Sequence, residues 1–277
     1  MKIVRDPGDL TIGDVEAGSV VTIGAFDGVH LGHRAVLRLV RELADARGLR
    51  ASLVTFDRHP AEVVRPESAP KLLTTLDHRL ELLDATGLLD LCVVLTFDEE
   101  RSRESAEDFV NEVLVGMLHT KLVVVGADFH FGHRRTGNVP LLEQMGADLG
   151  FEVLGLGLVA LQPGSVPFSS THVRELLATG DVAAASEVLG RPHELRGSLD
   201  AGLLTVEART CVPAAGRYRA TVAVGDGSGR SVVVAVGVEP RDGDVEVRTA
   251  SAAASAGPEA RVRFEDRIDQ SFGTVGA

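Results

Sequence analysis

Residues 20–40, VVTIGAFDGVHLGHRAVLRLV, decide the fold of this chain. The apolar run Val20–Ile23 predicts a short buried strand, and the glycine-containing turn Gly24–Gly28 follows it. Apolar residues then recur with helical spacing until Gly48, a natural stop, so we expect a helix over Leu31–Arg47. A strand, a glycine turn and a helix in this order predict the first βα unit of an α/β fold.

The turn and the start of the predicted helix form a candidate phosphate site. Glycine lets the backbone approach a ligand closely, and a helix N-terminus presents free N–H groups and the positive end of a dipole. His30 and His33 fall on one face of the first turn, where they can donate hydrogen bonds to phosphate oxygens. The alternative is an ordinary βα turn with two exposed histidines, but strand, turn and paired histidines together favour the phosphate site.

The alternation of strand and helix patterns continues to about residue 158. Near-continuous apolar runs predict parallel strands that are covered on both faces. These strands are Ala51–Phe56, Leu91–Thr96, Leu122–Val125 and Phe151–Leu156, and the helices between them are Leu76–Ala85, Ala106–Leu118 and Pro140–Leu149. This order predicts a doubly wound, Rossmann-like parallel α/β sheet whose ligands gather at the carboxyl ends of the strands.

The remainder of the chain has a different pattern, with short strand-like segments between Gly/Asp turns. The predicted strands are Arg217–Val224, Ser231–Val238, Val245–Arg248 and Ala260–Phe264. They predict a small antiparallel β-barrel-like domain that begins near Arg191-Pro192-His193. We therefore expect two domains, 1–190 and 191–277.

Composition and charge exclude several classes of function. The net charge of −12 argues against a nucleic-acid-binding surface. Cys92 and Cys211 form no C-x-x-C pair, and Cys92, within LCVVLTF, is expected to be a buried core thiol. The N-terminus has no apolar segment of signal-peptide length, and no apolar run approaches the length of a membrane span. We expect a soluble, cytoplasmic protein without a dedicated metal site.

The segment G-x-F-D-G-V-H-L-G-H at Gly24–His33 resembles the HxGH-type nucleotidylyltransferases, and most closely the adenylyltransferase module of the prokaryotic FAD synthetases. Those proteins typically join a riboflavin kinase module to an FMN adenylyltransferase module. Three further segments match the family in order, namely TFDRHP at 55–60, VGADFHFG at 125–132 and SSTHVR at 169–174. Four segments in order are far more specific than any one of them.

The resemblance implies transfer of AMP from ATP to FMN, which gives FAD and pyrophosphate, with Mg²⁺ accompanying ATP. It implies catalytic roles for His30, His33 and Arg174. The ATP-binding residues that it implies are Gly24, Ala25, Phe26, Asp27, His30, Gly32, His33, Ser169, Ser170, Thr171 and Arg174. The flavin-binding residues that it implies are Phe56, His59, Pro60, Asp128 and Phe129.

The chain also departs from the family pattern. Ala25 stands where the family commonly has Asn, and Arg58 where it usually has proline. In a flavokinase a G-x-x-x-G-R turn and a P-T-A-N segment follow R-P-x-x-L-x-G, but residues 193–224 of this chain contain neither, so the resemblance implies a shortened, kinase-inactive module. Two other hypotheses remain open, a non-catalytic flavin- or nucleotide-binding protein and nucleotidyl transfer to another phosphorylated small molecule.

Overall fold

The computed structural model of the protein describes residues 1–157, 168–225, 232–241, 244–249 and 257–268. The chain divides into two compact units, one formed by Met1–Pro70 with Leu76–Pro167 and the other by Lys71–Thr75 with Phe168–Ala277. Each unit has its own hydrophobic core. The expected boundary at residue 190 concerns functional modules, and it remains a prediction.

The first unit is built on a parallel sheet of six strands in the order β1-β4-β3-β2-β5-β8. The strands are β1 (Lys2–Val4), β2 (Ser19–Ile23), β3 (Arg50–Phe56), β4 (Leu91–Leu95), β5 (Thr120–Gly126) and β8 (Glu152–Leu156). The apolar runs predict all of them except β1. This edge strand has three residues, too few to show a periodic pattern.

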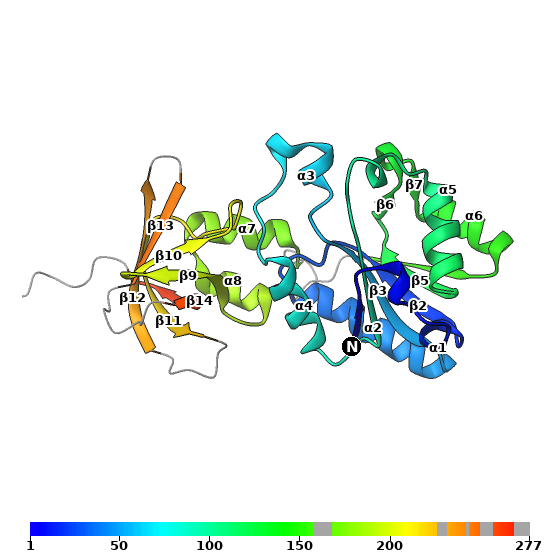
Figure 1. The fold of residues 1–277 in the computed structure, drawn as a ribbon, viewed down its shortest axis with the longest axis horizontal. Coiled ribbons are helices and arrows are strands. Elements are labelled where there is room, and N and C mark those ends of the chain that lie inside the picture. Colours follow the sequence, from blue (N-terminus) through cyan, green and yellow to red (C-terminus); the bar gives the residue numbers. More distant parts are fainter. Residues whose placement is uncertain (158–167, 226–231, 242–243, 250–256, 269–277) are drawn as a thin grey trace, which may run out of the picture. The chain divides into compact units, whose positions relative to one another are not determined.

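Helices cover both faces of this sheet (Figure 1). α2 (Leu31–Arg47) and α4 (Leu76–Asp84) pack on one face, whereas α5 (Ala106–Phe109), η4 (Val110–Met117) and α6 (Val139–Leu149) pack on the other. The helix predicted from Ala106 to Leu118 is present from Ala106 to Met117, but after α5 the chain continues as the π-helix η4. Apolar spacing alone does not separate these two helix types.

Short elements join these larger ones. They are η1 (Pro7–Asp9), α1 (Ile12–Val15), α3 (Ala61–Val64), η2 (Pro66–Ser68), η3 (Arg101–Arg103), β6 (His130–Phe131), η5 (His133–Arg135) and β7 (Gly137–Asn138). Among them, β6 and β7 pair as a small antiparallel ribbon. This ribbon and η5 follow β5 at the carboxyl end of the sheet.

The two faces of the sheet explain why its strands read as unbroken apolar runs. In β5, Leu122 and Val124 belong to the core beneath α2 and α4, whereas Val123 and Val125 belong to the core on the opposite face. Successive side chains of a strand point to opposite faces, so a strand covered on both sides needs apolar residues at every position. The doubly wound fold expected from the sequence is confirmed.

The strand order reverses between β2 and β5. The chain passes from β2 to β3 and β4 in one direction across the sheet and then returns to place β5 on the other side of β2. Ligands of doubly wound sheets bind outside the carboxyl ends of the strands at such a switch point. The turn that follows β2, which holds the predicted phosphate site, lies at this point.

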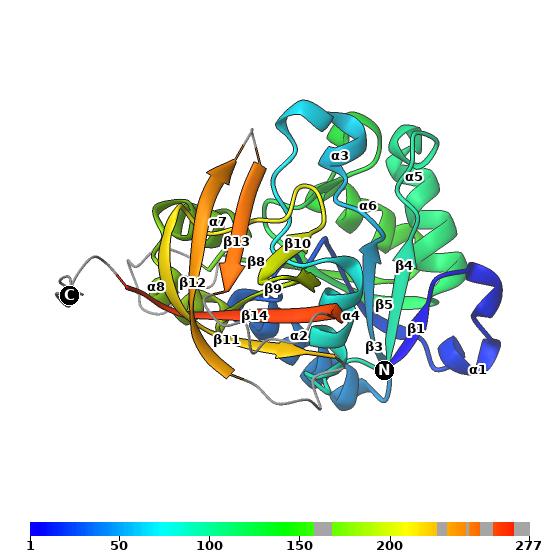
Figure 2. The same ribbon diagram turned by 60° about the vertical axis from the view of Figure 1, so that its left-hand side comes forward.

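The second unit combines two helices with an antiparallel barrel (Figure 2). The helices are α7 (Ser170–Thr179) and α8 (Val182–Leu189), and the barrel closes in the order β10-β13-β12-β11-β14-β9. Its strands are β9 (His193–Asp200), β10 (Leu203–Val206), β11 (Gly216–Val224), β12 (Val232–Arg241), β13 (Asp244–Thr249) and β14 (Gly257–Arg267). The expected barrel is confirmed, with β9 and β10 as strands that the sequence does not predict.

The barrel core is formed by alternate residues of its strands. On β11, Tyr218, Ala220 and Val222 are buried, and the Tyr218 ring meets Phe264 of β14 edge-on at 5.4 Å between centroids. β9 obscures this alternation, because His193 occupies a buried position and Glu194, beside it, is also buried. A polar residue at an inward position is why the strand pattern of β9 is weak in the sequence.

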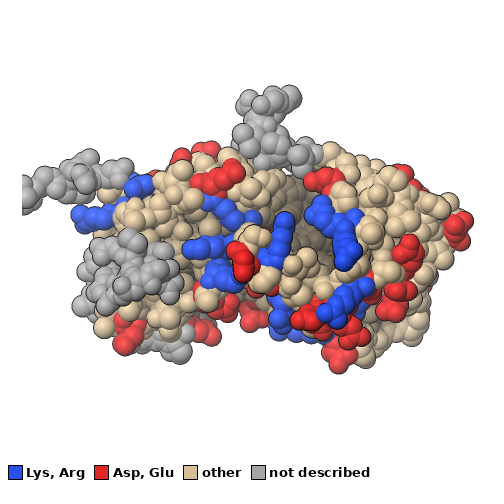
Figure 3. Space-filling model, turned by 90° about the horizontal axis from the view of Figure 1, so that it is seen from above, with Lys and Arg blue, Asp and Glu red and all other residues tan. Residues whose placement is uncertain are grey.

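Surface charge is mixed rather than uniformly acidic. Basic side chains lie among acidic ones on the face shown in Figure 3, so the net charge of −12 does not describe every local surface. In the part of the chain that the structure describes, no helix is both long and apolar enough to cross a membrane.

Candidate functional site

The histidine turn, residues Gly24–His33, leaves the carboxyl end of β2 and enters α2. Its backbone has positive φ angles at Phe26 (49°), Gly28 (81°) and Val29 (41°). This region is a marked outlier for a β-branched residue such as Val29, and strain of this kind persists only where the surroundings fix it. Phe26 and Val29 are buried in the core beneath α2, which supplies that constraint.

The two histidines of the turn contact each other. His30 is the N-cap of α2, and its Nδ1 accepts a hydrogen bond from the backbone N–H of His33 at 3.3 Å. Their rings stack with centroids 3.6 Å apart, and the Phe26 ring lies 4.6 Å from His33. Because Nδ1 of His30 is an acceptor, a neutral His30 ring carries its proton on Nε2. The turn therefore presents a histidine N–H donor beside the N-terminus of a long helix, an arrangement suited to phosphate.

Hydrogen bonds from side chains of neighbouring elements to backbone carbonyl oxygens fix the shape of the turn. The carbonyl oxygen of Ala25 accepts hydrogen bonds from Thr55 Oγ1 at 3.4 Å and from Arg79 Nη1 at 3.0 Å. Arg79 Nη2 also donates to the carbonyl oxygen of Phe56 at the end of β3. Asp27 is buried within the same turn.

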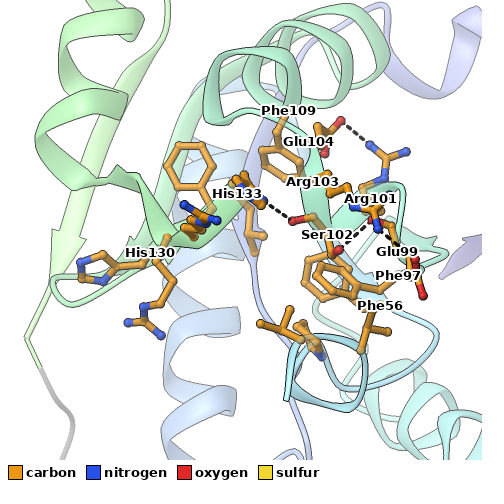
Figure 4. Close-up of a pocket in the computed structure, with 18 of the residues that line it drawn as sticks. Phe56, Phe97, Glu99, Arg101, Ser102, Arg103, Glu104, Phe109, His130 and His133 are labelled. Carbon is orange, nitrogen blue, oxygen red and sulfur yellow. Dashed lines mark hydrogen bonds and ion pairs between the residues drawn. The ribbon is translucent and has the colours of Figure 1, made fainter. Parts of the chain in front are cut away.

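A cavity of about 500 Å³ opens at the same edge of the first unit (Figure 4). Half of the ten phenylalanines in the chain line it, namely Phe56, Phe97, Phe109, Phe129 and Phe131. We call it the phenylalanine cavity. Phe129 and Phe131 stack at 5.5 Å between centroids, and Phe56 meets Phe97 edge-on at 5.3 Å. Its size and its aromatic walls suit a planar ring system.

Polar groups form another part of the cavity wall. Arg101 pairs with Glu104 at 2.5 Å, and Arg103 pairs with Glu99 at 3.0 Å (Figure 4). Burial raises the pKa of Glu104, and the hydrogen bond from Arg101 opposes that shift. The Nδ1 atom of His133 lies 3.0 Å from the carbonyl oxygen of Ser102, which can only accept, so Nδ1 donates and a neutral ring keeps Nε2 as an acceptor.

The structure brings together three of the five residues expected at the flavin. Phe56, Pro60 and Phe129 line the phenylalanine cavity, whereas His59 and Asp128 are not among its lining residues. The Nδ1 atom of His59 accepts the N–H of Ala61 at 3.1 Å and so supports the turn that starts α3. Asp128 is exposed on the loop after β5.

The remaining expected ATP-binding residues belong to the second unit. Ser169 is the N-cap of α7, and its Oγ accepts the backbone N–H of His172 at 3.1 Å, as a capping serine should. Ser170 and Thr171 form the first turn of this helix. Arg174 donates from Nε to the carbonyl oxygen of Lys71 at 2.6 Å, which connects α7 to the segment Lys71–Thr75.

The sequence does not assign Arg79, Phe97 and Phe109 to the site, and the second H-x-G-H, His130-Phe131-Gly132-His133, is interpreted from the sequence as coincidence although His133 lines the cavity. For Arg79 a usable signal exists, because it falls three residues after Leu76 and four before Leu83, on the apolar face of the predicted helix. A basic residue on that face is unusual enough to mark. Phe97 and Phe109 carry no such signal, because only the fold brings them to the cavity.

The chain is similar to known proteins over most of its length. A sequence model of the FAD synthetase family matches residues 13–172. Over 197 residues the chain is 32% identical to a bifunctional riboflavin kinase/FMN adenylyltransferase of Buchnera aphidicola subsp. Schizaphis graminum and 36% identical to that of Escherichia coli K12. Each alignment covers 71% of this chain and 62% of the relative, so the match spans less than two thirds of these proteins.

A solved structure shares the fold. The structure described as a macrolide-efflux protein from Streptococcus pneumoniae superposes with a TM-score of 0.78 and covers 99% of this chain and 92% of its own. Its sequence identity of 23% shows the fold alone. The family match, which covers more than half of the chain and includes the histidine turn, shows more than that: this chain belongs to the FAD synthetase family.

Proposed function

We propose that this protein is an FMN adenylyltransferase, which transfers AMP from ATP to FMN and forms FAD and pyrophosphate. The observation that carries the proposal is the meeting of two sites at one edge of the first unit. The histidine turn suits a phosphate, and the phenylalanine cavity suits a planar aromatic ring. Ile23, the last residue of β2 before the turn, also lines the cavity, so the two sites adjoin.

The proposed reaction needs no protein nucleophile. An oxygen of the FMN phosphate attacks the α-phosphorus of ATP in line, the bond between the α-phosphorus and the bridging oxygen breaks, and pyrophosphate leaves. Positioning and charge stabilisation suffice for such a transfer. His30 and His33 would stabilise the charge that develops on the phosphate oxygens, together with backbone N–H groups of the turn.

The assignment of phosphate-binding residues in α7 rests on the sequence segment SSTHVR at 169–174. Ser170, Thr171 and Arg174 of α7 are proposed to bind the β- and γ-phosphates and the leaving pyrophosphate. Among the described residues, no three His, Cys, Asp or Glu side chains are grouped to hold a metal ion. Because the charge of the triphosphate must be neutralised, we propose that Mg²⁺ enters with ATP and is held largely through its phosphates.

We propose that the flavin ring lies in the phenylalanine cavity against Phe56 and Phe129. The barrel of the second unit is proposed to lack riboflavin kinase activity, since residues 193–224, which follow Arg191-Pro192, contain neither a G-x-x-x-G-R nor a P-T-A-N segment. Cys92 and Cys211 are both buried, which suits a reducing compartment, and we propose that the reaction takes place in the cytoplasm.

A second candidate is a protein of the same family that binds flavin and nucleotide without catalysis. The observation that favours it is Ala25, which stands in the histidine turn where the family commonly has Asn. A third candidate, nucleotidyl transfer to another phosphorylated small molecule, differs only in the acceptor. The stacked pair of His30 and His33 favours catalysis over binding alone.

One assay separates these candidates. The protein is incubated with ATP, Mg²⁺ and either FMN or riboflavin, and the flavins are identified by chromatography. FAD from FMN is the expected result. FMN from riboflavin would overturn the proposal about the second unit. Tight flavin binding without any product would replace the enzyme proposal with the binding protein.

A further inference from the structure

Arg79 is a buried guanidinium that connects two neighbouring segments of the site. Its side chain lies on α4, and the residue is only 3% exposed. One amino group donates to the carbonyl oxygen of Ala25 in the histidine turn, and the other donates to the carbonyl oxygen of Phe56 at the end of β3. Phe56 in turn lines the phenylalanine cavity. A single side chain therefore contacts both proposed half-sites.

Burying the charged guanidinium of Arg79 at this position costs free energy. Burial lowers the pKa of Arg79, and the carboxylates of Asp27 and Asp57 oppose that effect. An apolar side chain would fill the same space without desolvating a cation. What arginine supplies in addition is a rigid fork of N–H donors, which reaches two acceptors at once in a fixed geometry.

The contact to Ala25 also sets the direction of a backbone donor. The Ala25 carbonyl oxygen is held by Arg79 from α4 and by Thr55 from β3. In a trans peptide the carbonyl of one residue and the N–H of the next point in opposite directions, and the described chain has no cis peptide bonds. The N–H of Phe26 is thereby directed away from Arg79, as part of the turn in which Phe26 has a φ of +49°.

We propose that Arg79 is a positioning residue, which fixes the position of the histidine turn relative to the phenylalanine cavity. It fixes the Ala25–Phe26 peptide so that its N–H is available to ATP, and it fixes the end of β3 so that the flavin ring lies at a set distance from that N–H. Arg79 touches neither substrate. The inference rests on the proposed function, since this relative position sets how the FMN phosphate approaches the α-phosphorus of ATP.

A matched control exists on the same face of the sheet. Arg41 of α2 is also largely buried, with its side chain 20% exposed, and it pairs with Asp90 at 2.8 Å and Asp45 at 2.6 Å. Removing Arg41 loses its ion pairs with Asp90 and Asp45 without touching the histidine turn or the cavity. Arg41→Met therefore reports what the loss of a structural arginine alone does.

The experiment compares the wild-type protein with Arg79→Met, Arg79→Lys and Arg41→Met, each at a temperature well below its own Tm. We expect Arg79→Met to lower kcat for FAD formation by about 100-fold, the scale of a misplaced reacting group. The Kd for FMN should change by less than about threefold, because the cavity walls remain. Arg79→Lys keeps the charge but lacks the planar guanidinium that donates to both carbonyl oxygens at once, and we expect kcat to fall by about tenfold. Arg41→Met should lower Tm and leave kcat within about twofold of wild type.

A second readout does not depend on turnover. The ten phenylalanines allow selective ¹⁵N labelling, and the Phe26 amide can be assigned by comparison with Phe26→Tyr. We expect its resonance to move on addition of MgATP in the wild type and in Arg41→Met. In Arg79→Met it should already differ before ATP is added and should respond weakly to it.

The outcomes separate the two proposals. Wild-type kcat in a folded Arg79→Met variant, or in Arg79→Lys if Arg79→Met does not fold, would overturn the role of Arg79 and leave the adenylyltransferase intact. An unchanged Phe26 amide in Arg79→Met would overturn it as well. If the wild type makes no FAD, the proposed function fails. An ATP response of Phe26 that depends on Arg79 would then still support the positioning of the nucleotide half of the site.

Discussion

The Nδ1 atom of His30 accepts the backbone N–H of His33 at 3.3 Å, and the two rings stack 3.6 Å apart. One side chain thus caps α2 and presents its other ring nitrogen as a possible donor. The spacing of the histidines follows from this geometry, because the third residue after an N-cap has the N–H that the cap satisfies. Capping and phosphate binding are separable by mutation.

His30→Asn should separate them. Asparagine is a good N-cap, so α2 should keep its start and Tm should stay within about 3 °C of wild type. The Nε2 donor is lost, and we expect kcat for FAD formation to fall by about 100-fold or more, the usual scale for an oxyanion donor. His30→Ala loses both roles and should also lower the free energy of unfolding by about 1 kcal/mol. Wild-type turnover in His30→Asn would show that this histidine only caps the helix.

Ala25→Asn tests the departure of the turn from the family pattern. The Ala25 side chain is half-buried, while its carbonyl is held by Thr55 and Arg79. An asparagine adds a polar group near the phosphate site without removing either backbone contact. We expect steady-state FAD formation to be unchanged or faster. A loss of more than about tenfold would contradict this account of the turn.

Phe129→Ala tests the phenylalanine cavity. Phe129 stacks on Phe131 and faces the cavity, so its removal should weaken FMN binding by about tenfold, measured by quenching of flavin fluorescence. Binding of MgATP should be unaffected. Leu149→Ala, at the exposed end of α6, is a suitable control because it lies outside the cavity. Equal FMN affinity in Phe129→Ala and wild type would place the flavin elsewhere.

Cys92 gives a prediction for pH. Burial raises the pKa of this thiol from 9.0 to about 12, and the charge of Arg79 opposes the shift. The unfolded thiol loses its proton above pH 9.0 while the folded one retains it, so the folded state binds more protons and stability falls as pH rises. From this group the free energy of unfolding should decrease by about 0.7 kcal/mol per pH unit at pH 9, and the slope should approach about 1.4 kcal/mol per unit by pH 11.

Urea unfolding of Cys92→Ala over the same pH range checks this claim. The variant should lack that part of the slope, whereas an unchanged slope would show that Cys92 does not titrate on unfolding. In the wild type, DTNB should label Cys92 and Cys211 only after unfolding, because both thiols are buried.

Much of the fold was predictable because its cause is local. The strand before His30 and the helix after it follow from apolar spacing and from Gly48, whose left-handed conformation ends α2. The π-helix η4 was not predictable, since it shares its apolar spacing with an α-helix. β9 was obscured by His193, whose Nε2 contacts the carbonyl oxygen of Cys211, a residue eighteen positions away.

The residues of the candidate site also differ in whether the sequence predicts them. The histidine turn is a contiguous motif and is visible in the sequence. The phenylalanine cavity is assembled from several elements, so Phe97, which follows β4, and Phe109 of α5 meet Phe56 of β3 only in the folded protein. Arg79 was predictable only in part. The sequence shows its place on the apolar face of a helix, but it does not show the two carbonyl oxygens that Arg79 contacts.

Transfer of a radioactive label from ATP to the flavin is the decisive measurement for the proposed adenylyltransferase. The protein is incubated with FMN, Mg²⁺ and ATP labelled with ³²P at either the α- or the γ-position, beside the His30→Asn variant. Transfer of AMP predicts that the α-label appears in FAD and the γ-label in pyrophosphate, with both products strongly reduced in His30→Asn. FAD without the α-label, or no labelled flavin at all while FMN remains bound, would contradict it.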